Sequence, residues 1–146
     1  MFTHILIASD GSEYALKAAR VAAEISKKFA AEVTLLSVFD PPVGQMALVD
    51  VAIPVLDPIE ISRYADEVQD TVEKNTGQVL EEAGVHYTAR RETGHPVDVI
   101  VSVAARSHVD LIVMGSRGLG GLESFLLGSV SDRVLHHAHC PILIVK

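Results

Sequence analysis

The sequence predicts an α/β protein: a single domain with an open, five-stranded parallel sheet and helices on both faces. Two observations carry this prediction. Short apolar runs alternate along the chain with longer segments of helical periodicity. The apolar runs also lack the polar alternation of half-exposed strands, which is typical of parallel strands covered by helices on both sides. The chain has 146 residues and no internal repeat, so we expect one domain over residues 1–146.

The first two expected strands and the first helix lie near the start of the chain. Residues 5–8 (ILIA) form an apolar run too short for a helix, and residues 33–38 (VTLLSV) predict a second buried strand. Between them, residues 12–29 have helical periodicity, and Ser12 can serve as the N-cap. The face of this helix that we expect to point inward comprises Ala15, Ala18, Ala19, Ala22, Ser26 and Phe29.

The rest of the chain predicts three more helices and three more strands in alternation. Their expected ranges are helix 60–83, edge-side strand 86–91, helix 96–105, strand 111–114, helix 129–137 and strand 141–145. Gly84 is the expected stop of the first of these helices, and Pro96 suits the first position of the next. The inward face of the 60–83 helix is expected to comprise Ile61, Tyr64, Ala65, Val68, Val72, Val79, Leu80 and Ala83.

Residues 40–58 (DPPVGQMALVDVAIPVLDP) interrupt this alternation. Four prolines prevent a continuous helix there, although the middle of the segment is apolar. A connection of this length is either a lid or partner surface, or a surface excursion that packs its own apolar residues.

Composition excludes several classes of partner. The net charge of −7 opposes a polyanion, so we expect no nucleic-acid partner. No apolar run approaches the ~18 residues that suggest a membrane span, and the first residues lack the basic and apolar regions of a secretory signal. The single cysteine, Cys140, permits no internal disulfide and fits a reducing compartment. We therefore expect a cytoplasmic protein with no membrane partner.

The expected sheet places a glycine-rich loop where ligands bind. In a Rossmann-like or flavodoxin-like sheet of order 3-2-1-4-5, ligands bind beyond the carboxyl ends of the strands, where the order reverses. Residues 9–11 (SDG) leave the first strand there, and residues 115–118 (GSRG) leave the fourth. Glycine adopts positive φ freely and admits close approach, so such a loop can cradle a phosphate. Gly128-Ser129 then opens a helix whose free N–H groups favour an anion. The alternatives are a flexible turn and an ordinary helix cap.

Other nucleotide and hydrolase motifs are absent. No glycine is followed by lysine, as a Walker A loop requires. A dinucleotide fingerprint starting at Gly118 would need glycine where Glu123 stands. The G-x-S-x-G elbow of α/β-hydrolases does not occur either. The spacing that remains is Gly115-x2-Gly118-x9-Gly128-Ser129, directly after an apolar strand and directly before a helix.

This pattern resembles the ATP-binding branch of the universal stress protein family. The resemblance covers nearly the whole chain and includes residues 5–12 (ILIASDGS), residues 94–96 (GHP) and residues 140–145 (CPILIV). It implies a dimeric α/β protein that binds ATP with Mg²⁺ at the point where the strand order reverses. The implied nucleotide-binding residues are Ala8, Ser9, Asp10, Val38, Met114, Gly115, Arg117, Gly118, Gly128, Ser129, Val130 and Ser131.

The resemblance also implies individual roles. Asp10 would lie near the ribose and phosphates and help to hold Mg²⁺, and Val38 would contact the adenine. Gly115 and Gly118 would follow the ribose and phosphate path, and residues 128–131 (GSVS) would hold the phosphates. Arg117 either offsets phosphate charge or is an exposed loop arginine without a role.

We therefore predict a regulatory, ATP-binding universal stress protein, with no fast ATP hydrolysis because no general base is visible near the loop. Slow hydrolysis, or autophosphorylation on Ser129 or another serine of the loop, stays open. Two alternatives remain: a small enzyme that uses ATP to adenylate or phosphorylate a second substrate, and a nucleotide-free dimeric interaction module. Residues 141–145 (PILIV) form an apolar edge strand, which predicts a homodimer through that strand. The cluster at residues 136–140 (HHAHC) suits a zinc site poorly, because adjacent side chains on a helix point apart.

Overall fold

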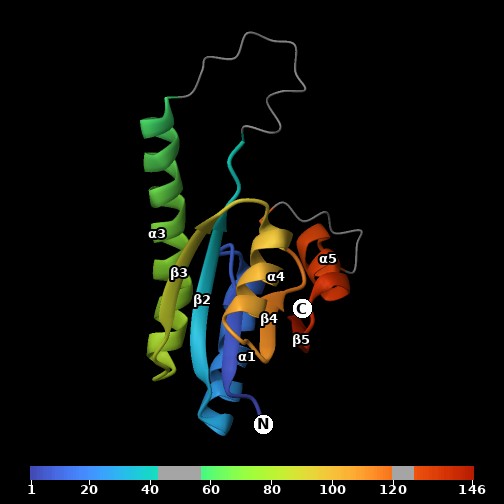
Figure 1. Ribbon diagram of the computed structural model, residues 1–146. Helices are drawn as coiled ribbons and strands as arrows, with labels where there is room; N and C mark the ends of the chain where they lie inside the picture. Colours follow the sequence, from blue (N-terminus) through green and yellow to red (C-terminus); the bar gives the residue numbers. More distant parts are fainter. Residues whose placement is uncertain (43–56, 120–126) are drawn as a thin grey trace.

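A five-stranded parallel sheet organises the fold. The computed structural model describes residues 1–42, 57–119 and 127–146. The strands lie in the order β3-β2-β1-β4-β5, and each neighbouring pair is parallel (Figure 1). Their bounds are β1 His4–Ala8, β2 Glu32–Phe39, β3 Thr88–Thr93, β4 Leu111–Gly115 and β5 Ile142–Val145. The predicted fold class and strand order are confirmed.

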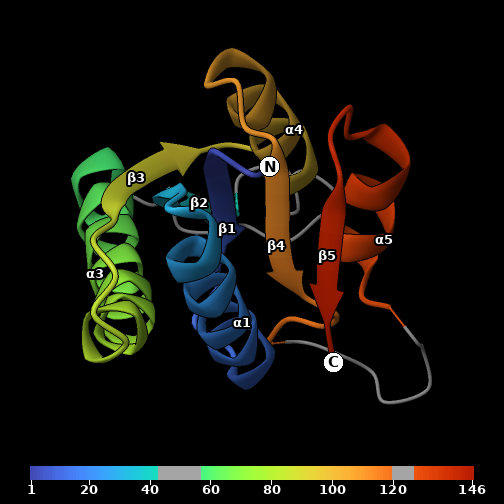
Figure 2. The same ribbon diagram turned by 90° about the horizontal axis from the view of Figure 1, so that it is seen from below.

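Helices cover both faces of this sheet. Their bounds are α1 Glu13–Phe29, α3 Pro58–Glu82, α4 Pro96–Arg106 and α5 Ser129–His137. Figure 2 shows α1 and α3 on one face, and α4 and α5 on the other. Alternate residues of a strand point to opposite faces of the sheet and so contribute to two hydrophobic cores. Ile5 and Ile7 pack with α1 and α3, whereas Leu6 and Ala8 pack with α4 and α5. The central strands are therefore buried on both sides, as their uninterrupted apolar sequences predict.

Helix α1 confirms the predicted cap and most of the predicted face. The Ser12 hydroxyl oxygen accepts the Ala15 N–H at 3.2 Å, which makes Ser12 the N-cap. The alanines of the predicted face and Ser26 are buried. Phe29 is the exception: it lies at the end of the helix and is 36% exposed. Its ring packs edge-to-face with that of Phe2.

The buried face of helix α3 differs from the predicted one. It begins two residues earlier than expected, with Pro58 in the first turn and Asp57 as N-cap. Its first turns extend beyond the carboxyl ends of the strands (Figure 1). No sheet lies under those turns, so Tyr64 is 59% exposed rather than buried, with its ring edge-on to Phe39. Further along, the buried residues include polar ones, Gln69 and Thr76, that the apolar pattern did not select.

Strand β3 is displaced by two residues from its predicted range. Pairing with β2 runs from Thr88 to Thr93, whereas the alternation predicted residues 86–91. Tyr87 does not enter the ladder: its hydroxyl lies against Gly77 of α3, where any larger residue would collide with the ring. Tyr87 thus packs on α3 one residue before the pairing of β3 begins. The strand lies at the sheet edge, as predicted.

Part of two predictions falls outside the described residues. Residues 43–56 hold most of the 40–58 segment, and residues 120–126 hold the second half of the glycine loop. Within the described ranges, no helix is long and apolar enough to cross a membrane.

Candidate functional site at the carboxyl ends of β1 and β4

The strand order reverses between β1 and β4, as predicted. These two strands pair directly, with Ala8 opposite Met114, and their neighbours β2 and β5 lie on opposite sides. Residues 9–11 and residues 115–118 therefore leave adjacent strands at the same end of the sheet. This is the position at which open α/β sheets bind their ligands.

The Asp10 carboxylate joins the two loops. Its Oδ1 accepts the Ser12 N–H at 2.9 Å, which closes the turn before α1. Its Oδ2 accepts the Leu119 N–H at 3.0 Å, from the glycine loop. Ser12 fills the N-cap position itself, so Asp10 is not needed as the helix cap. Asp10 is exposed, and each of its oxygens retains a further lone pair for a ligand.

Close approach of neighbouring atoms requires glycine at Gly115 and favours it at Gly118 and Gly128. A Cβ atom at Gly118 would lie 2.5 Å from Oδ2 of Asp10, and one at Gly115 would lie 2.7 Å from Cβ of Tyr14. A Cβ atom at Gly128 would lie 3.3 Å from the carbonyl oxygen of Ser116. The second predicted reason, positive φ, is wrong for these three residues. The glycines with positive φ in the described residues are Gly11, Gly84 and Gly94.

The N-terminus of α5 is fastened to the end of β4. The Gly128 N–H donates to the carbonyl oxygen of Ser116 at 2.6 Å. The buried Ser131 hydroxyl donates to the same oxygen at 3.0 Å and to the Gly128 carbonyl at 3.1 Å. The Ser131 hydroxyl is thus engaged within the protein, whereas Ser129 is exposed. The first-turn N–H groups of Ser129, Val130 and Ser131 are those a helix leaves without an intrahelical acceptor.

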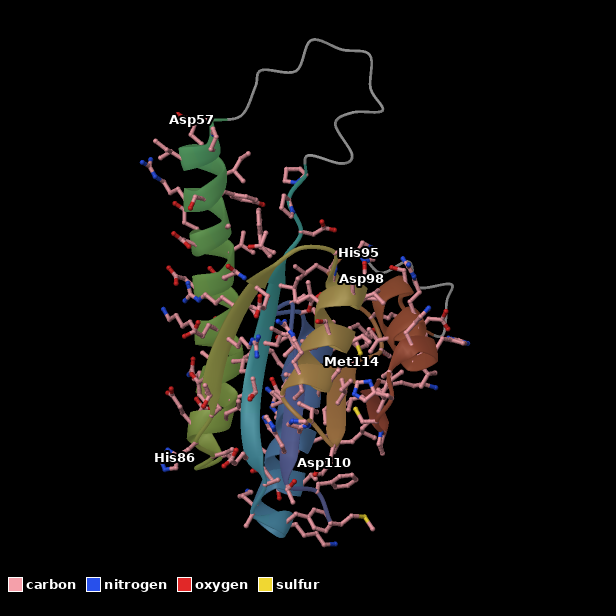
Figure 3. The ribbon with its side chains drawn as sticks, viewed as in Figure 1. Asp57, His86, His95, Asp98, Asp110 and Met114 are labelled. Carbon is pink, nitrogen blue, oxygen red and sulfur yellow. The ribbon has the colours of Figure 1, made fainter. Side chains whose placement is uncertain are left out.

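Three predicted apolar residues gather beside these loops. Ala8 and Met114 are 9% and 5% exposed, and Val38 is half-buried against the same core cluster (Figure 3 labels Met114). All three lie on the sheet face that α4 and α5 cover. They form an apolar wall that stands next to the polar groups of residues 9–11 and 115–118.

Arg117 extends over α1. Its guanidinium carbon lies 5.9 Å from the ring centroid of Tyr14, a cation–π arrangement. Its role in offsetting phosphate charge stays a prediction.

Helix α3 supplies residues that sequence analysis missed. The Ser9 and Thr76 hydroxyls lie 2.8 Å apart in the buried interior. The Gln69 side-chain amide donates to the carbonyls of Ser37 and Glu92, at 3.2 and 3.1 Å, and so joins the ends of β2 and β3. Gln69 and Thr76 share a helix face with the predicted Val72, and that spacing was the available signal.

The histidines and the shifted titratable groups lie elsewhere. His95 and Asp98 are 3.6 Å apart at the start of α4 and are both exposed (Figure 3). The rings of His136 and His137 contact carbonyls of their own helix, each at 2.7 Å. Within the described residues, no three His, Cys, Asp or Glu side chains gather as a metal site. Burial, followed by the charge of Asp110, raises the pKa of the Cys140 thiol at the far end of the sheet.

Two open hollows on α3 do not compete with this site. One is lined by Pro58, Ile59, Ser62, Arg63 and Asp66. The other includes Arg91, whose guanidinium is already paired with Asp70 and Glu73. Neither hollow contains a residue of the two loops.

An open parallel sheet with a glycine loop at the reversal of strand order defines a doubly wound α/β protein with its ligand position at β1 and β4. Within that class, the chain belongs to the universal stress protein family, which matches residues 1–146. It is 40% identical to a universal stress protein of Methanocaldococcus jannaschii, over 100% of this chain and 83% of the relative. It is 34% identical to one of Bacillus subtilis, with both chains covered completely.

Solved structures share the fold. A universal stress protein of Lactobacillus plantarum superposes with a TM-score of 0.79 at 25% identity, over 99% of this chain and 98% of that one. A universal stress protein in complex with cAMP gives 0.70 at 23% identity, over 99% and 97%. A family member of Arabidopsis thaliana with AMP bound gives 0.61 at 24% identity, over 99% and 91%.

Proposed function

We propose that this protein binds ATP at the carboxyl ends of β1 and β4, and that nucleotide occupancy regulates a partner interaction in a stress response. The observation that supports it best is the contact between Asp10 and the glycine loop: Oδ2 of Asp10 accepts the Leu119 N–H, and a Cβ atom at Gly118 would lie 2.5 Å from the same oxygen. The backbone N–H groups of a glycine loop can bind an anion, because glycine has no side chain to keep the anion away. Relatives of this fold in complex with cAMP and with AMP support an adenine nucleotide.

Each part of the site suits one part of the ligand. The apolar wall of Ala8, Val38 and Met114 suits the adenine, and the exposed start of α5 suits the phosphates. Gly115 and Gly118 would follow the ribose and phosphate path between them. We assign the nucleotide to these residues together with Ser9, Asp10, Arg117, Gly128, Ser129, Val130 and Ser131.

The site also fits a magnesium ion carried by the nucleotide. Mg²⁺ prefers carboxylate and phosphate oxygens and keeps several waters, so one exposed protein carboxylate suffices. Asp10 supplies such a carboxylate, with one lone pair on each oxygen beyond the two hydrogen bonds to backbone N–H groups. The ion would offset repulsion between this carboxylate and the triphosphate.

We propose regulation rather than catalysis. Turnover would be limited to slow hydrolysis or to autophosphorylation on Ser129, whose side chain is exposed at the start of α5. An enzyme that adenylates or phosphorylates a second substrate would instead release pyrophosphate or ADP only when that substrate is present, which an assay of both products detects.

We also propose a cytoplasmic homodimer through β5. This strand lies at the sheet edge and has the sequence ILIV, with all four residues half-buried in the single chain. An apolar edge strand is a template for pairing with a second chain. A monomeric mass at micromolar concentration, measured by light scattering, would contradict this proposal.

The binding proposal is tested by calorimetric titration of nucleotide-stripped protein with Mg-ATP. We expect a dissociation constant in the micromolar range or below, and about 10- to 100-fold weaker binding for Gly118→Val, because the valine side chain would displace the Asp10 carboxylate from the loop. Leu119→Ala is the matched control: this side chain is 78% exposed, and its N–H is retained. A folded wild-type protein that binds no adenine nucleotide would overturn the proposal in favour of a nucleotide-free interaction module.

A further inference from the structure

Thr76 of α3 is a buried polar residue directed at the site rather than at its own helix. Its side chain has no exposed surface, and its Oγ1 lies 2.8 Å from Oγ of Ser9, 67 positions away in sequence. A buried hydroxyl destabilises a protein unless it is hydrogen bonded, so this pair constrains both partners. Ser9 is the first residue after β1.

Ser9 in turn shapes the loop after β1. Its Oγ accepts the Gly11 N–H at 3.1 Å, and its own N–H donates to the carbonyl of Leu36 at 3.0 Å. Gly11 has a φ of +77°, and a Cβ atom there would meet Val72 of α3 at 3.4 Å. Helix α3 thus contacts this turn through Thr76 at Ser9, and its Val72 side chain lies beside Gly11.

The turn held in this way carries Asp10. Because Oδ1 of Asp10 is bound within the turn, the position of the turn sets where Oδ2 lies. Oδ2 accepts the Leu119 N–H and lies against Gly118. A displacement of the turn would therefore reach the glycine loop without any change in that loop's own sequence.

We propose that Thr76 is a positioning residue for the nucleotide site and acts through Ser9 to place Asp10 against the glycine loop. That the ligand is a nucleotide rests on the proposed function. The series of hydrogen bonds from Thr76 to Leu119 does not depend on it, so this series can be tested without nucleotide.

Ser26 provides the matched control. Ser26 is also buried, at 6% exposed against 0% for Thr76, and its hydroxyl donates to the carbonyl of Ala31 at 2.8 Å. It lies near the end of α1 and the start of β2, away from the carboxyl ends of the strands. Ser26→Ala therefore removes a buried hydroxyl whose hydrogen bond has the same length, 2.8 Å, from a place that does not contact the site.

The experiment compares Thr76→Val, Thr76→Ser and Ser26→Ala with wild type at a temperature where circular dichroism shows all four folded. The first readout is the amide proton chemical shift of Leu119 without nucleotide, which moves upfield when the bond to Asp10 weakens. The second is the dissociation constant for Mg-ATP. Thr76→Val retains the shape of threonine, whereas Thr76→Ser retains the hydroxyl.

We expect Thr76→Val to move the Leu119 resonance and to weaken Mg-ATP binding about fivefold, since one hydrogen bond is lost. Thr76→Ser should restore both readouts, and Ser26→Ala should change neither. In a Ser9→Ala background, Thr76→Val should have no further effect, because both changes break the same link.

An unmoved Leu119 resonance in folded Thr76→Val would overturn the proposal, as would a full fivefold effect in the Ser9→Ala background. Failure of wild type to bind Mg-ATP would overturn the proposed function instead. In that case the Leu119 resonance still decides whether Thr76 positions the turn.

Discussion

Two aspartates connect β1 to the β4 region, one at each end of the strands, and they do so differently. Asp110 lies just before β4, and its carboxylate accepts the Thr3 N–H, the Thr3 hydroxyl and the His4 N–H at 2.7, 2.6 and 3.1 Å (Figure 3). Asp10 lies just after β1 and accepts one N–H on each oxygen, from Ser12 and Leu119. The first carboxylate has three donors and is half-buried, and the second has two and is exposed.

The difference separates a structural contact from a candidate ligand contact. No glycine is adjacent to Asp110 in the sequence, and its donors are Thr3, just before β1, and His4, the first residue of β1. Asp10 instead bonds to a loop in which Gly118 permits the closest approach in the site. A carboxylate that binds a ligand needs free lone pairs, exposure to solvent and space beside it. Of these two aspartates, only Asp10 has all three.

The largest expected effect is on Asp10. Asp10→Ala removes both acceptors and the charge, so we expect Mg-ATP binding to weaken at least about tenfold, as for the loss of a charge-assisted hydrogen bond. Calorimetric titration measures this. Asp110→Asn should bind Mg-ATP as wild type does. Equal losses of Mg-ATP affinity in the two variants would contradict the assignment of Asp10 to the ligand site and of Asp110 to a structural role.

A second expected effect is on stability at neutral pH. Asp110→Asn replaces the charged acceptor of three hydrogen bonds, and we expect a loss of about 1–2 kcal/mol in the free energy of unfolding. Urea denaturation at pH 7 measures it. Asp10→Asn, whose carboxylate is exposed, should lose less. The reverse order would show that Asp10 is the structural aspartate.

The smallest expected effect is the pH dependence of the stability difference between wild type and Asp110→Asn. Burial alone would raise the pKa of Asp110, but hydrogen bonds from Thr3 and His4 outweigh it and lower the pKa below its ordinary value. A carboxyl with a lowered folded pKa contributes stability that is complete above its unfolded pKa, about 3.9, and is lost as the pH falls through the folded value.

The stability gap between wild type and Asp110→Asn should therefore stay constant from pH 7 to about pH 5 and narrow below about pH 4. Denaturation in urea at several pH values checks this. A gap that widens in acid would mean that the Asp110 carboxylate is destabilised in the folded protein.

The sequence by itself determined the parallel sheet, the strand order and the place of the candidate site. Buried parallel strands are apolar on both faces, so their sequences can be distinguished from those of amphipathic helices without knowledge of tertiary contacts. Helix α5 was predicted with its observed bounds, and Ser12 as the cap of α1, because caps and helical periodicity are local properties. The glycine spacing likewise identified the loop beside Asp10.

Only the tertiary structure decided which groups touch at that site. Periodicity states which face of α3 points inward, but not where the sheet ends beneath it, and so Tyr64 was wrongly placed inside. It also gave no reason to select Thr76, whose hydroxyl is satisfied by a residue 67 positions away. The three glycines are favoured by limited space rather than by a positive φ, because Asp10, Tyr14 and Ser116 lie close to them from other segments. Such approaches depend on how separate elements pack, which no local stretch of sequence encodes.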